Sequence, residues 1–149
     1  MADRGVSSVL GYALALAIVT ILISGIFAGM GTVVENQRET AIRSELTVIG
    51  NRIAADISAV DRLVLATSST ADVRIATTLP RTVAGKAYSI NVSDGGPPSH
   101  RYRIDLSSSD PDITETVFVR SNTTVRDVQL QGGDVEVVFD GTTVEVVHD

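Results

Sequence analysis

The sequence predicts an α+β fold, in which one long N-terminal helix precedes a small antiparallel β-sheet or sandwich. Three observations predict it. Residues 6–34 hold no charge, residues 35–66 carry apolar side chains at helical spacing, and short Val- and Ile-rich runs follow from Asp72 onward. The corresponding segments are a leader (residues 1–5), a transmembrane helix, an amphipathic helical stem and a β domain (residues 67–149).

The segment from Val6 to Val34 has the length and composition of a membrane-spanning helix. Its 29 residues carry no charge and lie between Arg4 and Glu35. As a helix they would extend roughly 43 Å, whereas the hydrocarbon core of a bilayer is about 30 Å thick. A buried helix of a soluble protein is the alternative. A helix that is apolar on every face needs a large surrounding core, however, which a chain of 149 residues can hardly supply.

The composition excludes several classes of chemistry. Cysteine is absent, which rules out disulfides, thiolate metal sites and cysteine nucleophiles. The two histidines, His100 and His148, are far apart, and no nucleophile elbow, phosphate-binding glycine loop or Ser/His/Asp constellation can be assembled. A net charge of −6 argues against a nucleic-acid partner, whose phosphates would be repelled. We therefore expect that the protein is not an enzyme and has neither catalytic residues nor a cofactor.

One acidic cluster is a weak candidate for metal binding. Asp110, Asp112 and Glu115 could supply carboxylate oxygens to calcium, which prefers oxygen ligands. Their spacing lacks the rest of an EF-hand loop, and Pro111 between the two aspartates favours an ordinary solvated turn. We therefore expect no metal site here.

The charged residues are skewed in type. Twelve Asp and six Glu accompany eleven Arg and a single Lys. Crowded acidic groups cost little in concentrated salt, because 1 M salt screens charges beyond about 3 Å. Together with the absence of cysteine, this skew is typical of halophilic adaptation.

The junction before the apolar segment, residues 4–11, reads Arg-Gly-Val-Ser-Ser-Val-Leu-Gly. It resembles the start of archaeal type IV pilins, notably haloarchaeal ones, in which an Arg-Gly pair precedes the cleavage site and a Val-Ser-Pro-Val-Ile-Gly-like run opens the apolar helix. The resemblance implies cleavage by a prepilin peptidase between Gly5 and Val6, after which the helix remains as an anchor or filament core. Ser8 stands where those pilins usually have Pro. Residues 35–65 and the Val-rich tail resemble an uncharacterised haloarchaeal pilin-like family more than they resemble the major pilins.

Gly25 and Gly29 form a Gly-x-x-x-Gly pair within the apolar segment. Such a pair lets two helix backbones approach closely in lipid. Glycine is also simply common in membrane helices, so both interpretations stay open. If the helix packs against other helices, these two glycines mark the packing face.

Helical periodicity continues from Glu35 to Ala66 without a proline. Apolar residues spaced by threes and fours form one stripe, which comprises Ile42, Leu46, Ile49, Ile53, Ile57, Val60 and Leu63/Val64. Glu39 and Arg43 stand at the i,i+4 spacing that favours an ion pair on a helix. The stripe predicts an amphipathic stem that is covered either by the chain's own sheet or by another helix.

Strand-like runs follow a polar break at Thr67–Ala71. Each is short, rich in Val, Ile, Tyr or Phe, and bounded by turn residues. The predicted strands are Val73–Thr77, Ala87–Val92, Arg101–Leu106, Thr114–Arg120, Val125–Gln131, Val135–Phe139 and Thr142–Val147.

The last hairpin has a predicted register. A two-residue turn at Asp140-Gly141 pairs Val137 with Val144. The same register gives the pairs Phe139–Thr142 and Val135–Val146, and these six residues share the face that is expected to be buried. It also puts Glu136 directly opposite Glu145, a like-charge pair that is destabilising in dilute buffer and tolerable at high salt.

Two sequons are candidate N-glycosylation sites, Asn91-Val92-Ser93 and Asn122-Thr123-Thr124. Asn91 alternates with apolar neighbours, which predicts that it lies on the polar face of its strand. Asn122 lies in a predicted turn. Both would be accessible to glycosylation if the β domain is extracellular.

We interpret the chain as a membrane-anchored, pilin-like envelope protein with a structural or assembly role, of the minor pilin or pseudopilin type. The expected partners are the lipid bilayer, other pilin-like helices in a homo- or hetero-oligomer, and the prepilin peptidase. The C-terminal domain would lie outside the cell or on a surface filament. Arginine counts, Arg4 before the span against Arg38 and Arg43 after it, favour the opposite orientation by the positive-inside rule.

Two alternatives stay open. The first is a single-pass protein that never polymerises and acts as a binding or stator-like accessory module. The second is a secreted β protein whose signal is removed near Gly29. The alternatives differ in whether the apolar helix survives processing and whether it meets other helices.

Overall fold

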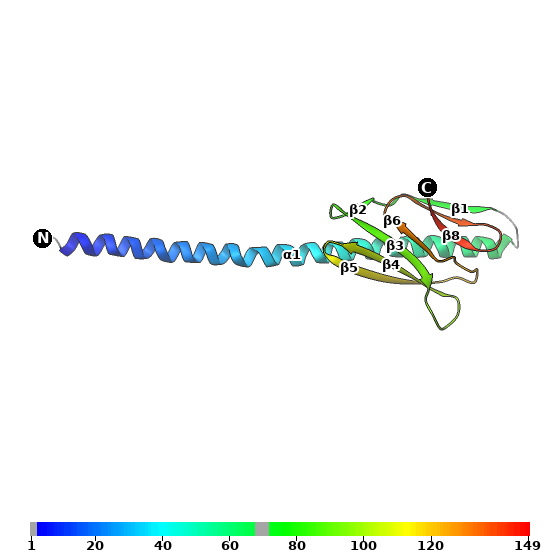
Figure 1. Ribbon diagram of the computed structural model, residues 1–149, viewed down its shortest axis with the longest axis horizontal. Coiled ribbons are helices and arrows are strands. Elements are labelled where there is room, and N and C mark those ends of the chain that lie inside the picture. The colour runs from blue at the N-terminus through cyan, green and yellow to red at the C-terminus, as the bar shows by residue number, and fades with distance from the viewer. Residues whose placement is uncertain (1–2, 68–71) are drawn as a thin grey trace. The chain divides into compact units, whose positions relative to one another are not determined.

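The computed structural model describes the backbone of residues 3–67 and 72–149, and the side chains of these residues except 3–8 and 30–32. One helix, α1, runs from Asp3 to Thr67 (Figure 1). The chain forms two compact units, Met1–Arg38 and Glu39–Asp149. The first unit contains the uncharged part of α1. The second contains the amphipathic part of α1, hereafter the stem (Glu39–Thr67), and the β domain.

The described residues of the second unit form eight strands in two antiparallel sheets (Figure 1). The strands are β1 (Val73–Thr77), β2 (Thr82–Val83), β3 (Lys86–Asp94), β4 (Arg101–Ser109), β5 (Asp112–Arg120), β6 (Val128–Gln131), β7 (Val135–Phe139) and β8 (Val144–His148). One sheet has the order β1-β7-β8. The other has the order β2-β3-β4-β5, with β6 also paired to β3. This layout confirms the predicted α+β class.

One hydrophobic core joins the stem to both sheets. The predicted stripe from Ile42 to Val60 is buried, whereas Leu63 at its end is exposed and Val64 packs against the core. The strand residues in the same core include Ile90, Val92, Ile104, Leu106, Val135, Val137, Val144 and Val146. The chain's own sheets therefore cover the stripe, which was one of the two predicted possibilities.

Gly50 shows how closely the stem approaches the larger sheet. A Cβ atom at this position would lie 2.7 Å from Leu106 Cδ1 and 2.8 Å from Val117 Cγ2. Both distances are shorter than real van der Waals contacts allow. Glycine at this position therefore lets the helix backbone lie directly against β4 and β5.

Several strand boundaries differ from the predicted ones. β2 was not predicted, because two residues are too few to show an alternating pattern. β4 and β5 extend to the turn at Asp110–Pro111, whereas the predicted strands ended at Leu106 and began again at Thr114. β6 begins at Val128, and Val125 instead makes an isolated bridge to Val144. The predicted break at Thr67–Ala71 falls mostly on residues 68–71, outside the described part of the chain.

The predicted register of the last hairpin is wrong by two residues. Phe139 pairs with Val144, so that residues 140–143 form a four-residue loop in place of a two-residue turn. The Asp140 carboxylate causes this, because it accepts hydrogen bonds of 2.8 Å from the backbone N–H groups of both Thr142 and Thr143. The same bonds, from Thr143 first, hold the pKa of Asp140 below its usual value.

The corrected register separates the two glutamates of this hairpin. Glu136 lies opposite Val147, and Glu145 lies opposite Val138. Glu145 also forms an ion pair with Arg126, in which Oε2 and Nη1 lie 2.8 Å apart. The like-charge pair therefore does not exist, and the hairpin offers no argument for high salt. Five of the six residues expected on the buried face are nevertheless buried, because a shift of two residues leaves each side chain on the same face. The sixth, Thr142, is exposed in the loop.

Candidate functional site

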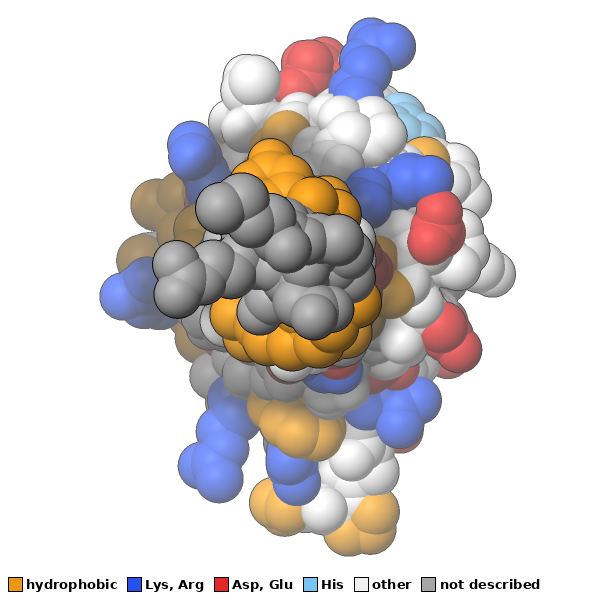
Figure 2. Space-filling model, turned by 90° about the vertical axis from the view of Figure 1, so that its left-hand side faces the viewer, with side chains coloured by type: hydrophobic (Ala, Val, Ile, Leu, Met, Phe, Trp, Pro, Cys, Tyr) orange, Lys and Arg blue, Asp and Glu red, His pale blue; other side chains and the backbone are white. Residues whose placement is uncertain are grey.

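The first unit presents an uncharged and apolar helical surface. The described side chains from Val9 to Val34 are exposed, and their large apolar members are between 49% and 72% exposed. Figure 2 faces the N-terminal end of α1 and shows its apolar side chains, in orange, projecting on more than one side. A contiguous apolar surface of this size is rare on a soluble monomer and indicates a membrane or protein interaction.

Two hydroxyl groups within this surface, those of Thr20 and Ser24, are satisfied by the helix itself. Thr20 Oγ1 donates to the Leu16 carbonyl oxygen, and Ser24 Oγ donates to the Thr20 carbonyl oxygen, each at 2.8 Å. Inside hydrocarbon, polar groups have no water to bind, so each must find an internal partner. These two side chains therefore add little cost to burial in lipid.

Three glycines of the apolar segment share one face of α1. Gly25 and Gly29 are one turn apart, and Gly11 precedes Gly29 by 18 residues, which is five helical turns. A Cβ atom at any of the three would meet nothing within 4 Å. Internal packing therefore does not require glycine at these positions, although glycine costs a helix about 1 kcal/mol relative to alanine.

The predicted processing site lies at the start of the same helix. The backbone of Gly5 and Val6 is helical as part of α1. The side chain of Val6 lies outside the described part of the structure. The cleavage therefore stays a prediction.

The two sequons have different surroundings. Asn91 lies in the middle of β3, half-buried, between Asp105 of β4 and Gln129 of β6. Asn122 is exposed in the loop after β5, but its Nδ2 atom donates to the Asp61 carboxylate at 3.3 Å. The nitrogen that would carry a glycan at Asn122 is thus already bonded in the folded domain.

Asp61 on the stem is a buried carboxylate that the sequence analysis did not single out. It is 5% exposed and accepts four hydrogen bonds from Asn122 and Thr123, two from backbone N–H groups and two from side chains. Burial alone would raise the pKa of Asp61, but the hydrogen bonds, those from Thr123 first, outweigh burial and hold the pKa below its usual value. A charged residue beside Val60 of the apolar stripe was the sequence signal for this site.

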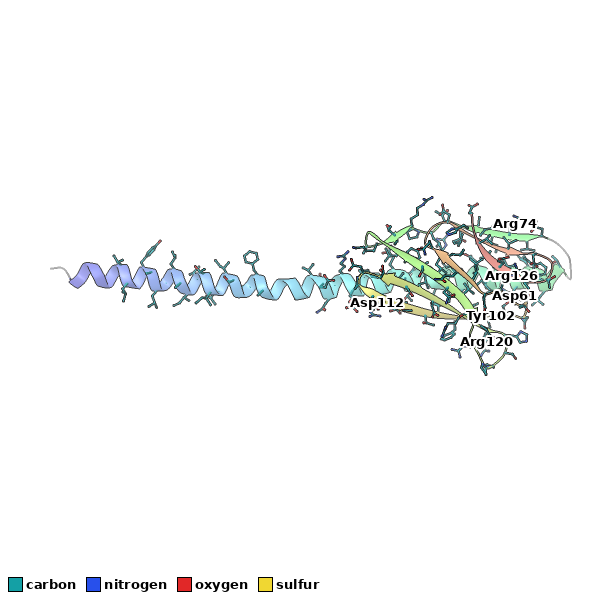
Figure 3. The ribbon with its side chains drawn as sticks, viewed as in Figure 1. Asp61, Arg74, Tyr102, Asp112, Arg120 and Arg126 are labelled. Carbon is teal, nitrogen blue, oxygen red and sulfur yellow. The ribbon has the colours of Figure 1, made fainter. Side chains whose placement is uncertain are left out.

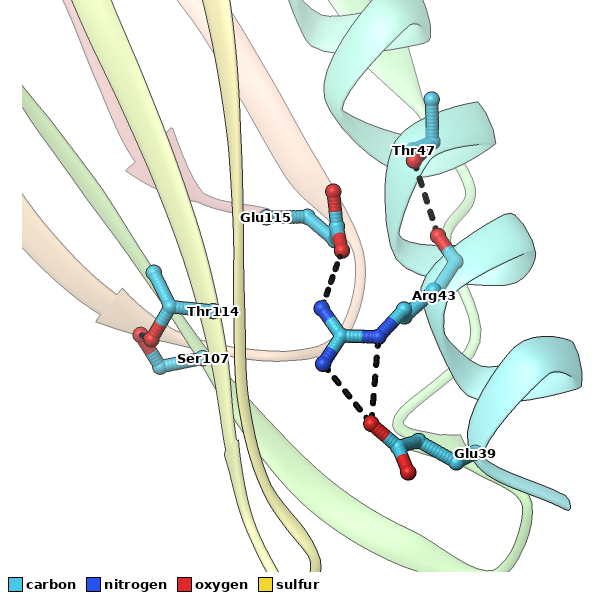
Figure 4. Close-up of polar contacts among 6 residues, drawn as sticks. All are labelled: Glu39, Arg43, Thr47, Ser107, Thr114 and Glu115. Atoms are coloured by element: carbon cyan, nitrogen blue, oxygen red, sulfur yellow. Dashed lines mark hydrogen bonds and ion pairs between the residues drawn. The ribbon is translucent and has the colours of Figure 1, made fainter. Parts of the chain in front are cut away.

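Arg43 makes a second polar link between the stem and the larger sheet (Figure 4). Its guanidinium group donates to Glu39 on the same helix and to Glu115 on β5, each at 2.8 Å. The hydrogen bonds to Glu39 and then Glu115 raise the pKa of Arg43 above its usual value. The predicted Glu39–Arg43 pair is confirmed, and Glu115 extends it to the sheet.

The structure does not gather the acidic residues that were weighed as calcium ligands. Asp110 pairs with Lys86 at 2.5 Å, and Glu115 is held by Arg43. Asp112 is exposed on the outer face of the sheet, whereas Glu115 points to the stem side. Among residues 3–67 and 72–149, no group of three or more metal-ligating side chains is brought together.

The fold and these surfaces define an α+β protein in which one helix of the described chain is long and apolar enough to cross a membrane. The chain belongs to a family of unknown function, DUF7266, whose model matches residues 1–147. No curated protein and no solved structure matches the chain.

Proposed function

We propose that the protein is a single-pass, membrane-anchored envelope protein of the pilin-like kind, with a structural role in assembly rather than catalysis. The observation that carries this proposal is the uncharged surface of α1 from Val9 to Val34. All of its described side chains are exposed, and the hydroxyl groups of Thr20 and Ser24 are bonded within the helix. Such a surface favours lipid or other apolar helices over water. In this proposal the β domain lies outside the cell, and prepilin peptidase removes residues 1–5.

The glycine face supports packing against other helices in addition to lipid. Lipid does not require glycine on a helix, and the chain's own packing does not require Gly11, Gly25 or Gly29. A second helix does benefit, because the absence of side chains lets two backbones approach closely. This observation favours an assembling protein over the non-polymerising accessory module, which stays the second candidate.

We expect that replacing Gly25 and Gly29 together by leucine weakens association between full-length chains about tenfold. Leucine at these positions holds the two helix backbones apart, and a loss of about 1.4 kcal/mol of association free energy corresponds to a factor of ten. The measurement is energy transfer between donor- and acceptor-labelled chains reconstituted in lipid vesicles.

The control is Ala13→Leu, which also introduces a leucine at a small residue of the same helix, but away from the glycine face. This variant should associate like the original chain. If the original chain, the double glycine variant and Ala13→Leu associate equally, the glycine face has no role in association. A chain that is monomeric at every density in the vesicles would favour the accessory module.

A further inference from the structure

Two arginines lie directly opposite each other at one end of the β4–β5 hairpin. Arg101 pairs with Arg120 across the two strands. The Arg101 guanidinium carbon lies 3.6 Å from the centre of the Phe118 ring, which is 47% exposed. Among the described residues, neither Arg101 nor Arg120 forms an ion pair. We call Arg101, Phe118 and Arg120 the basic patch.

The basic patch is unexpected in an acidic protein. Like charges directly opposite each other destabilise a sheet. The neighbouring Arg103 differs, because its charge is balanced by an ion pair. The Arg103 Nε atom lies 2.9 Å from the Asp105 carboxylate. The arrangement of Arg101 and Arg120 therefore leaves two positive charges and an aromatic ring available to a partner from outside the chain.

The opposite end of the same hairpin is acidic. Asp112 is exposed and forms no ion pair within the described chain, and Asp110 pairs with Lys86. We call Asp110–Asp112 the acidic turn. Figure 3 labels Asp112 and Arg120 at the two ends of β5. A strand of nine residues separates them by about 27 Å.

The hairpin has a defined direction along the stem. Arg43 bonds to Glu115 near the start of β5, and Asp61 bonds to Asn122 just after its end. The helix between Arg43 and Asp61 is about 27 Å long, and the extended chain between Glu115 and Asn122 is about 24 Å long. β5 therefore runs alongside the stem in the same direction, with the acidic turn at the Arg43 end and the basic patch at the Asp61 end.

We propose that the basic patch binds the acidic turn of a second copy of this chain, with the stems of the two copies pointing the same way. This inference rests on the proposed function, because copies that assemble from one membrane share one direction. A displacement of about 27 Å per copy belongs to an assembly whose helices have left the plane of the bilayer. Each copy carries both surfaces, so the contact is heterologous and repeats from copy to copy without closing. A symmetric antiparallel pairing of two β5 strands would also match Asp112 with Arg120, but it would point the two stems in opposite directions.

The charges of the basic patch and the acidic turn determine which surfaces meet and in what register. They contribute little to the affinity between copies. Exposed ion pairs contribute little each, whereas juxtaposed like charges oppose association strongly. The apolar helices would supply most of the association free energy. The charged ends of the hairpin would then set how far one copy is displaced along the next.

The test uses full-length chains in detergent, because a single bilayer would hold neighbouring copies at the same height. Ser99 and Ser109 are both replaced by cysteine. Both serines are exposed, Ser99 beside the basic patch and Ser109 beside the acidic turn, and the natural chain has no cysteine to interfere. A short bis-maleimide cross-linker should produce a ladder of dimers, trimers and larger species. Chains with only one of the two cysteines should not produce the ladder.

Two charge variants locate the contact. Arg101→Glu with Arg120→Glu makes both hairpin ends acidic, and Asp110→Lys with Asp112→Lys makes both ends basic. Each variant alone should lose trimers and larger species at least about tenfold. An equal mixture of the two should restore them, which also shows that both variants fold. Arg52→Glu with Arg81→Glu changes the net charge equally at two exposed arginines elsewhere and should leave the ladder intact.

Three outcomes would overturn the proposal. A ladder that is unchanged in both charge variants would show that these charges do not form the contact. Products that stop at dimers would indicate the symmetric antiparallel pairing. If energy transfer between labelled original chains persists but no ladder forms, this contact fails while the proposed function stands. Loss of both signals would instead contradict the proposed function itself.

Discussion

Replacing Asp61 by alanine is expected to lower the free energy of unfolding of the second unit by about 3 kcal/mol. Asp61 is buried and accepts four hydrogen bonds from Asn122 and Thr123. A hydrogen bond to a charged group contributes roughly 1.5–3 kcal/mol, and the donors left without a partner add a further cost. Chemical denaturation of the full-length chain in detergent, followed by circular dichroism of the β domain, measures the difference.

The effect of Asp61 should also depend on pH. Because the pKa of Asp61 is lower in the folded chain than in the unfolded one, the stabilisation is fully present above the unfolded pKa, near 4, and is lost as pH falls through the folded pKa. Asp61→Asn and the original chain should therefore converge in stability at acid pH. Asp72→Ala, at an exposed carboxylate, is the control and should change stability by less than about 0.5 kcal/mol. Equal stability of Asp61→Asn and the original chain at neutral pH would contradict this assignment.

Replacing Ile53 by alanine is expected to lower the free energy of unfolding by about 3 kcal/mol. Ile53 is 0% exposed and lies in the core that the stem shares with both sheets. Shortening a buried isoleucine costs its transfer free energy plus the cavity left behind. The same denaturation measurement applies.

Val48→Ala is the matched control for Ile53→Ala. Val48 lies on the same stretch of helix but is 64% exposed, so its truncation should change stability by less than about 0.5 kcal/mol. Similar losses for the two variants would mean that the stem does not present one face to the sheets. A negligible loss of unfolding free energy for Ile53→Ala would mean that the stem is not part of the core of the β domain.

The elements predicted best from the sequence are those whose pattern is local. The spacing of Ile42, Leu46 and Ile53 is enough to predict one buried face of a helix, and the alternation in Val135–Phe139 is enough to predict a strand. The hairpin register depended instead on one side chain. Asp140 bonds to the backbone of Thr142 and Thr143, and this local competition replaced the expected two-residue turn with a longer loop.

The polar sites could not be predicted because they join distant segments. Asp61 and Thr123 are 62 residues apart, and only the folded core brings them together. The contact between Arg101 and Phe118 requires the register of β4 against β5, which a single sequence does not specify. By contrast, the apolar surface and the glycines of α1 are visible in the sequence, since both depend on residues within one helix.

The central claim is that the apolar helix is a permanent part of the mature protein. N-terminal sequencing of the protein extracted by detergent from its native membrane fraction tests this most directly. The account predicts a chain that begins at Val6 and retains the apolar segment through Val34. A mature chain that begins near Gly29 and is recovered in the soluble fraction would contradict the claim, and a membrane-bound chain that begins at Met1 or Ala2 would contradict the proposed cleavage.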